Sequence, residues 1–166
     1  MDAQRKIILA NAAGLLWSVL LLWVAVTFVT LPVFALMPTI MSAFLAPGLV
    51  MAGMVARLAL RRFRDRAMRD RDVPSDSAVI DQRVLSQTGE QIVLALCIWP
   101  AAAVILGGNG PGVIVCLGLG LAVAQLVFWA GSYLSQPLRI FGFAASFSPT
   151  MLVGLWAVGK LISGFQ

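Results

Sequence analysis

The sequence predicts an all-α integral membrane protein with five spanning helices. Of its 166 residues, 60% are hydrophobic and only 11% are charged, and its mean hydropathy is +0.94. Two long stretches carry at most one charged residue each. Soluble domains contain roughly 25% charged residues, so the composition excludes that class. Because each span needs ~20 residues, we expect one small membrane domain over residues 1–166.

The first uncharged stretch runs from Ile7 to Ala56 and is too long for one span. A reversal is expected between Thr27 and Pro32, because a proline disfavours helix at the residue before it. The first helix is interpreted as a retained anchor, since its apolar run exceeds the ~7 to 15 residues of a signal-peptide core. Pro38 and Pro47 should kink the second helix. The predicted spans are residues 7–29 and 33–59.

A charged segment follows, with eight arginines and five aspartates between positions 57 and 83. It predicts a cytoplasmic helix extension and loop at about 60–83, with turn residues at Pro74 to Ser77. The excess of arginine places this segment and the amino terminus in the cytoplasm. Nucleic-acid binding is the alternative, but the segment adjoins a span and lacks interleaved aromatic residues. We therefore expect membrane lipids as partners and no nucleic acid.

The second apolar stretch is interrupted at Gly107 to Gly112 by glycine, asparagine and proline, which predict a turn between two helices. Ser135 to Pro137 ends the second of these helices. Five alternating spans then bring Arg139 to the same membrane face as Arg83 and Glu90. Small residues on these helices predict close helix packing, namely Gly118, Gly120, Gly131, Gly142, Ala145 and Ser146. The predicted spans are residues 84–106, 113–134 and 138–162.

The run RVLSQTGEQ, from Arg83 to Gln91, is the most informative stretch of the chain. On a helix, Arg83, Gln87 and Glu90 fall within roughly 60° of one another. Glu90 is the one charged residue between Arg83 and Arg139, and an ionisable group in an apolar span indicates a functional site. The alternative is that Glu90 pairs with Arg83 or a neighbouring helix and only fixes packing.

Histidine is absent, and the two cysteines, Cys97 and Cys116, lie within apolar runs without CxxC spacing. These features argue against a structural zinc site, a haem site and histidine acid–base chemistry. We therefore predict no metal site. Both cysteines are expected to pack as small apolar side chains, without a disulfide.

Two motifs resemble those of the membrane-associated proteins in eicosanoid and glutathione metabolism, the MAPEG family. RVLSQTGEQ is similar to the family signature R-x-x-x-N-x-x-E, and QLVFWAGSYLSQPLRIFGFAASFSPT, from Gln125 to Thr150, is similar to a second bacterial pattern. The resemblance implies a four-helix bundle formed by the second to fifth spans, with one added N-terminal transmembrane helix. It also implies a homotrimer in a bacterial plasma membrane.

The resemblance further implies glutathione as a cofactor, bound between subunits near the cytoplasmic face. Arg83, Gln87 and Glu90 match positions that contact glutathione, and Arg139 matches the arginine that stabilises or orients its thiolate. Glutathione carries two carboxylates and an ammonium, so it requires cationic and anionic protein groups close together. Its thiol requires a nearby positive charge or hydroxyl donor to ionise. Arg139 is therefore the candidate catalytic residue.

The chain departs from the family pattern at several candidate glutathione-binding positions. Gln87 stands where the family has asparagine, and Gln125 stands where it has arginine. Ser132 stands where the family has tyrosine, although the next residue of this chain is a tyrosine, Tyr133. Phe143 stands where mammalian enzymes have another tyrosine. These changes remove charged and hydroxyl donors.

Two functions follow from the resemblance. One is a glutathione-dependent transferase or peroxidase acting on a lipophilic small molecule. The other is a non-catalytic lipid-binding or scaffolding protein on the same fold. A transporter subunit is a weaker alternative, since the membrane region holds one carboxylate and the sequence shows no paired repeats.

Overall fold

The computed structural model describes residues 2–29, 31–32, 36–68 and 76–164, with the backbone alone at 2–3, 65–68 and 76. Within these ranges the protein is all-α, which confirms the predicted class, and contains no strand. The helices are α1 (Asp2–Phe28), α2 (Leu36–Ala43), α3 (Leu45–Met68), α4 (Asp76–Ile105), the short 3₁₀ helix η2 (Gly107–Asn109), α5 (Gly110–Leu134) and α6 (Gln136–Ser163).

Five helical segments are long and apolar enough to cross a membrane, as predicted. They are Gln4–Phe28, Leu36–Arg64, Ser77–Ile105, Gly107–Leu134 and Gln136–Ser163. The chain is therefore a multi-pass membrane protein. Helices α3 and α4 extend well beyond their predicted spans: α3 continues to Met68, and α4 begins at Asp76 and so carries Arg83 well inside its helix. The predicted start of the second span at Val33 and the loop residues Pro74 and Ser75 lie outside the described residues.

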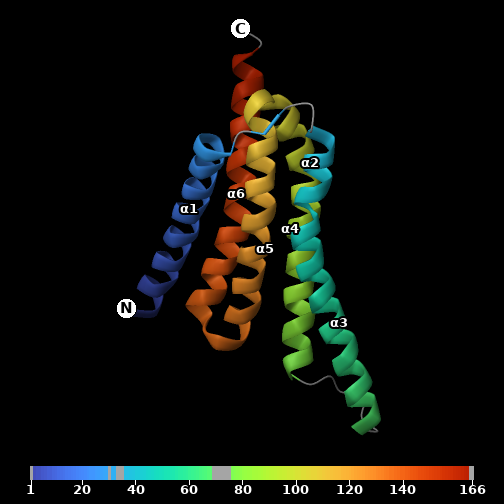
Figure 1. Cartoon of the computed structure of the whole chain (residues 1–166). Helices are drawn as coiled ribbons and strands as arrows, with labels where there is room; N and C mark the ends of the chain where they lie inside the picture. Colours follow the sequence, from blue (N-terminus) through green and yellow to red (C-terminus); the bar gives the residue numbers. More distant parts are fainter. Residues whose placement is uncertain (1, 30, 33–35, 69–75, 165–166) are drawn as a thin grey trace.

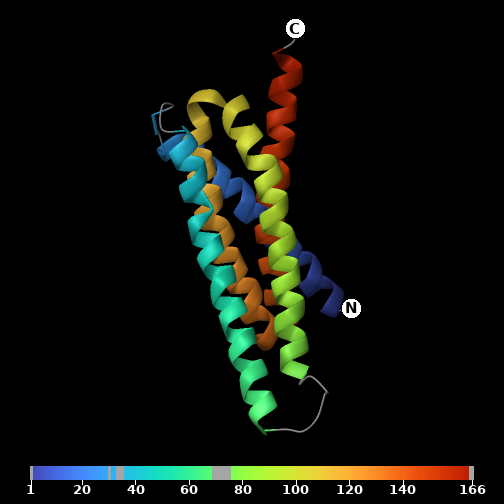
Figure 2. The same cartoon turned by 90° about the vertical axis from the view of Figure 1, so that its right-hand side faces the viewer.

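Helix α5 occupies the centre of the bundle and packs against α1, α2, α3, α4 and α6. Helix α1 crosses obliquely over α5 and α6, on the outside of the other helices (Figures 1 and 2). The main apolar core lies among α4, α5 and α6, where Trp99, Ile114 and Leu117 are fully buried. The indole of Trp99 also donates a hydrogen bond to Thr150 Oγ1 on α6, at 3.2 Å.

The second span is broken at Phe44, between α2 and α3. Pro47 causes the break, because it has no N–H to offer the carbonyl of Ala43 and its ring clashes with that carbonyl. The kink predicted at Pro47 is thus confirmed. The kink predicted at Pro38 stays a prediction, since the residue four positions before Pro38 lies outside the described part of the chain.

The small residues on α5 and α6 do allow close approach, as predicted. A Cβ atom on Gly118 would overlap the backbone carbonyl of Ala43, and one on Gly142 would overlap the backbone of Phe128. The turn before α5 also needs glycine, because Gly107 has φ +60°. The glycines therefore fix the distances of α2 and α6 from the central helix.

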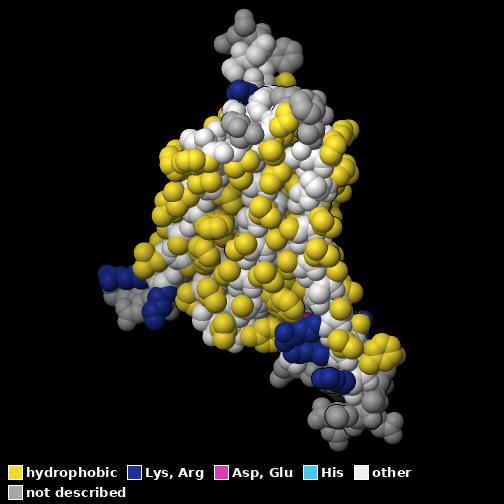
Figure 3. Space-filling view, viewed as in Figure 1, with side chains coloured by type: hydrophobic (Ala, Val, Ile, Leu, Met, Phe, Trp, Pro, Cys, Tyr) yellow, Lys and Arg dark blue, Asp and Glu magenta, His cyan; other side chains and the backbone are white. Residues whose placement is uncertain are grey.

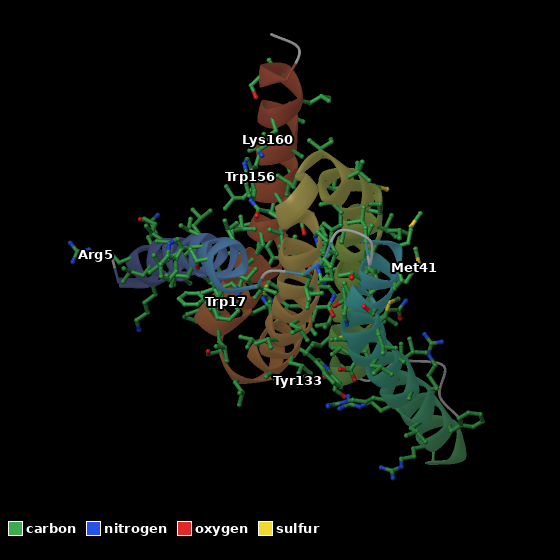
Figure 4. The ribbon with its side chains drawn as sticks, turned by 45° about the horizontal axis from the view of Figure 1, so that its top comes forward. Arg5, Trp17, Met41, Tyr133, Trp156 and Lys160 are labelled. Atoms are coloured by element: carbon green, nitrogen blue, oxygen red, sulfur yellow. The ribbon has the colours of Figure 1, made fainter. Side chains whose placement is uncertain are left out.

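The positive charges gather at one end of the bundle. Figure 3 shows lysine and arginine side chains at the start of α1 and toward the end of α3, both at the lower end of the bundle. The α5–α6 junction lies at this same end (Figure 1). Lys160 lies at the other end, near the carboxyl terminus (Figure 4). This asymmetry is the pattern expected when the basic end faces the cytoplasm. The orientation in the membrane stays a prediction.

The first test addresses that orientation. Single cysteines replacing Ser77 and Asn109, in a background with Cys97 and Cys116 changed to alanine, should react with a membrane-impermeant thiol reagent from opposite sides. The expectation follows from the position of Ser77 at the start of α4 and Asn109 in η2. Labelling of both positions from one side of sealed vesicles would contradict the five-span topology.

The second test addresses the close packing of α5. Gly118→Ala should lower the free energy of unfolding by about 1 to 3 kcal/mol, because the added methyl group meets a backbone carbonyl that cannot move away freely. Gly53→Ala is the matched control, since a Cβ there meets nothing within 4 Å. Reversible unfolding in mixed micelles measures both. Equal effects of the two changes would show that the close contact at Gly118 does not constrain the bundle.

Candidate functional site

A pocket of about 340 Å³ lies where α4, α5 and α6 meet at the basic end of the bundle. Its lining combines two arginines and one amide with apolar side chains, namely Arg83, Gln87, Phe128, Arg139, Ile140 and Phe143. The structure therefore brings three of the predicted site residues, Arg83, Gln87 and Arg139, to one place.

The parallel course of α4 and α6 explains this grouping. Both helices run from the basic end toward the opposite end (Figure 1). Arg83 and Arg139 are 56 residues apart in the sequence (139 − 83), and so are Gln87 and Phe143 (143 − 87). Successive turns of α4 therefore meet successive turns of α6. The interval also separates Ile98 from Gly154, whose added Cβ would lie 3.2 Å from the Ile98 side chain. One constant register thus runs along both helices.

The contact of α5 with α6 forms the apolar wall of the pocket. Because Gly142 has no side chain, α6 can lie against the backbone at Phe128. The ring of Phe128 then lies 6.2 Å from that of Phe143, measured between centroids, and the Phe143 ring stacks on Phe147 at 6.0 Å. The pocket therefore has an aromatic side and a cationic side.

The two arginines of the pocket have no carboxylate partner among the described residues. Both are exposed. A guanidinium group offers several N–H donors in a plane, which matches a carboxylate or phosphate. The pocket is therefore suited to an anion that also has an apolar part.

The other predicted site residues lie elsewhere. Glu90 is exposed on α4 and accepts a hydrogen bond from Ser86 Oγ at 3.4 Å, without pairing with Arg83. Gln125 is fully buried, and neither atom of its side-chain amide has a hydrogen-bond partner among the described residues. Burying an unpaired amide is costly. Thr88, also fully buried, has an unpaired hydroxyl as well.

Ser132 and Tyr133 line a second hollow, of about 370 Å³, which shares only Arg139 with the pocket. The hydroxyl of Ser132 donates to the Phe128 carbonyl of its own helix at 2.9 Å. The hydroxyl of Tyr133 donates to Asp81 Oδ1. Both hydroxyls are thus already engaged within the protein.

Asp81 has more polar partners than any predicted site residue, and its role was not predicted from the sequence. It is only 4% exposed, and its Oδ2 lies 3.4 Å from Arg57 Nε and 3.3 Å from Arg61 Nε. Neither Nε donates a hydrogen bond to Oδ2, so these ion pairs act through charge. Its Oδ1 accepts hydrogen bonds from Trp129 Nε1, at 3.3 Å, and from the Tyr133 hydroxyl. One carboxylate therefore joins α3, α4 and α5.

Aromatic rings complete this Asp81 cluster, which we define as Asp81, Arg57, Arg61, Trp129 and Tyr133. The guanidinium carbon of Arg57 lies 5.1 Å from the Trp129 ring centroid and 5.0 Å from that of Tyr133. Cation–π contacts of this kind add to the ion pairs. Tyr133 lies at the end of the bundle opposite Lys160 (Figure 4).

A signal for this cluster does exist in the sequence. Arg57 and Arg61 are four residues apart, as are Trp129 and Tyr133, so each pair lies on one face of a helix. The sequence does not show which of five aspartates between positions 57 and 83 meets those faces.

No family model, curated protein or solved structure matches this chain. No group of three or more histidine, cysteine, aspartate or glutamate residues that could hold a metal ion occurs in the described part of the chain.

The third test removes the charge of Asp81. Asp81→Asn should lower the free energy of unfolding by about 2 to 3 kcal/mol, because it leaves two partly buried guanidinium groups without their carboxylate. Arg64→Gln is the matched control for loss of one charged group, since Arg64 is exposed and forms no ion pair with a described carboxylate. Chemical unfolding in mixed micelles measures both variants. If Asp81→Asn were as stable as wild type, the cluster would carry no structural role.

Proposed function

We propose that the chain is a MAPEG-like membrane protein that binds glutathione in the pocket between Arg83 and Arg139. One observation carries the proposal: two arginines far apart in the sequence line one pocket together with Gln87. These are the positions that the family resemblance assigns to glutathione binding and thiolate stabilisation. The pocket lies at the basic end of a five-span bundle.

The lining matches the chemistry of such a ligand. Arg83 would bind a glutathione carboxylate, and Gln87 offers an amide donor and acceptor beside it. Arg139 would stabilise the thiolate, because a nearby cation lowers the energy of the ionised sulfur. Phe128 and Phe143 would contact a lipophilic electrophile or hydroperoxide. In the proposed reaction with an electrophile, the thiolate forms a carbon–sulfur bond while the bond to the leaving group breaks. With a hydroperoxide, the thiolate attacks oxygen and the O–O bond breaks, the alcohol leaves, and a second glutathione converts the resulting sulfenic acid to the disulfide and water.

The proposal includes a homotrimer. Glu90 is exposed on a spanning helix, where the Ser86 hydroxyl is its one polar partner among the described residues. A carboxylate exposed to lipid is costly, so a second copy that covers this face would remove the cost. Glu90 would then be available for the glutathione ammonium at a boundary between copies.

A non-catalytic lipid-binding protein is the second candidate. It is favoured by the positions of Ser132 and Tyr133, whose hydroxyls are held by Phe128 and Asp81 and do not line the pocket. Without a hydroxyl donor, ionisation of the thiol depends on Arg139 alone. A pocket with two arginines and two phenylalanines also suits the carboxylate and chain of a lipid anion.

The fourth test separates these candidates. Arg83→Ala should raise the dissociation constant for glutathione about tenfold, because it removes a hydrogen bond to a charged group. Arg139→Ala should chiefly reduce thiolate absorbance and turnover with an aryl halide. Arg64→Ala is the control, as an exposed arginine that lines neither the pocket nor the second hollow. Calorimetry and absorbance near neutral pH give the readouts.

The enzyme proposal fails if the wild type shows neither thiolate absorbance nor turnover at millimolar glutathione. Retention of a lipid anion by the same protein, lost in Arg83→Ala, would then support the lipid-binding candidate.

A further inference from the structure

A groove of about 450 Å³ lies between α3 and α4 and shares no residue with the pocket. It is lined by Val55, Leu58, Ala59, Arg62, Phe63, Gln82 and Leu85. Its volume lies within the range of ~300 to 1,000 Å³ that is usual for ligand sites.

The groove changes in polarity along the membrane direction. Val55 and Leu85 are the lining residues nearest the middle of their helical segments, whereas Arg62 lies in the arginine-rich part of α3, six residues beyond the last residue of the uncharged stretch, Ala56. Val55 and Arg62 are separated by seven residues, or about 10 Å of helix. Gln82 also lies toward the basic end of α4. The groove is therefore apolar within the membrane and cationic at its edge.

Arg62 is available for a ligand, in contrast to its neighbours on α3. Arg57 and Arg61 both face Asp81. Arg62 is exposed and forms no ion pair with any carboxylate in the described ranges. Beside it, Phe63 and Leu60 are 75% and 62% exposed. Figure 3 shows the arginine and hydrophobic side chains side by side at this end of α3.

We propose that this groove binds one anionic phospholipid, with an acyl chain along Val55, Leu58 and Leu85 and the phosphate at Arg62. The groove has the polarity of a lipid in the adjoining leaflet, since its apolar part begins at Val55 in the uncharged stretch and its cationic mouth lies among the arginines that follow that stretch. An unpaired guanidinium group at the mouth complements a phosphate. The bound lipid would bridge α3 and α4 next to the Asp81 cluster.

A test uses native mass spectrometry of the purified full chain, with phosphatidylglycerol as the anionic probe and phosphatidylcholine as the neutral one. The wild type should retain one phosphatidylglycerol per chain in preference to phosphatidylcholine. Arg62→Gln should reduce phosphatidylglycerol affinity about fivefold, since one arginine near the membrane surface contributes about that factor. Arg64→Gln, which changes an exposed arginine outside the groove, is the matched control.

A second pair of variants tests the apolar part of the site. Ala59→Trp should fill the groove and reduce retention of both lipids, because Ala59 lines it. Ala56→Trp is the control, as an exposed alanine on the same helix that does not line the groove. All four substituted residues are exposed, so the variants should fold.

Equal losses in Arg62→Gln and Arg64→Gln would overturn the proposal, because they would indicate diffuse surface charge. Unchanged retention in Ala59→Trp would also overturn it. If Ala59→Trp instead lowered the mass of the assembly with no effect on lipid, the groove would be an interface between copies of the chain.

Discussion

The buried carboxylate of Asp81 is the contact on which the basic end of the bundle depends. It comes from α4, pairs with two arginines of α3 and accepts hydrogen bonds from two aromatic residues of α5. Each partner alone would be a partly buried polar group at the edge of a membrane, so the cluster is most stable when complete. Asp81 fixes the first turns of α4 against α5. Arg83 lies less than one helical turn further along α4, so these contacts also determine the position of Arg83 in the pocket.

The pocket is built from that fixed turn and from close packing on the other side of α5. Gly142 lets α6 lie against the backbone at Phe128, and this brings Arg139 beside the α4 face that carries Arg83 and Gln87. The polar contacts thus position one wall and the glycine contacts position the other. The proposed phospholipid site lies between α3 and α4, and the proposed glutathione site lies among α4, α5 and α6. The Asp81 cluster links α3, α4 and α5 and so holds the helices that border both sites.

The fold could be predicted from the sequence because membrane spans depend on composition and length, and prolines and glycines mark their ends. The grouping of Arg83 with Arg139 followed from alternating spans. The Asp81 cluster did not, since its partners lie far apart in the chain and five aspartates compete for one position. Gln125 was assigned to the glutathione site by resemblance, yet it is fully buried and does not line the pocket. The spacing of residues in the sequence determines which of them share a helix face. Which two faces contact each other depends on how the helices pack, and the spacing does not show this.

Crosslinking across the pocket tests most directly whether the Asp81 cluster positions it. Cysteines replacing Gln87 and Phe143, which both line the pocket, are introduced with Cys97 and Cys116 changed to alanine. A short thiol crosslinker should join the two cysteines within one chain, and Asp81→Asn should slow the reaction. The control pair, Gln87→Cys with Leu155→Cys, should not react, because Leu155 lies about 18 Å further along α6. No crosslink within a chain, or an unchanged rate in Asp81→Asn, would contradict the proposed dependence of the pocket on Asp81.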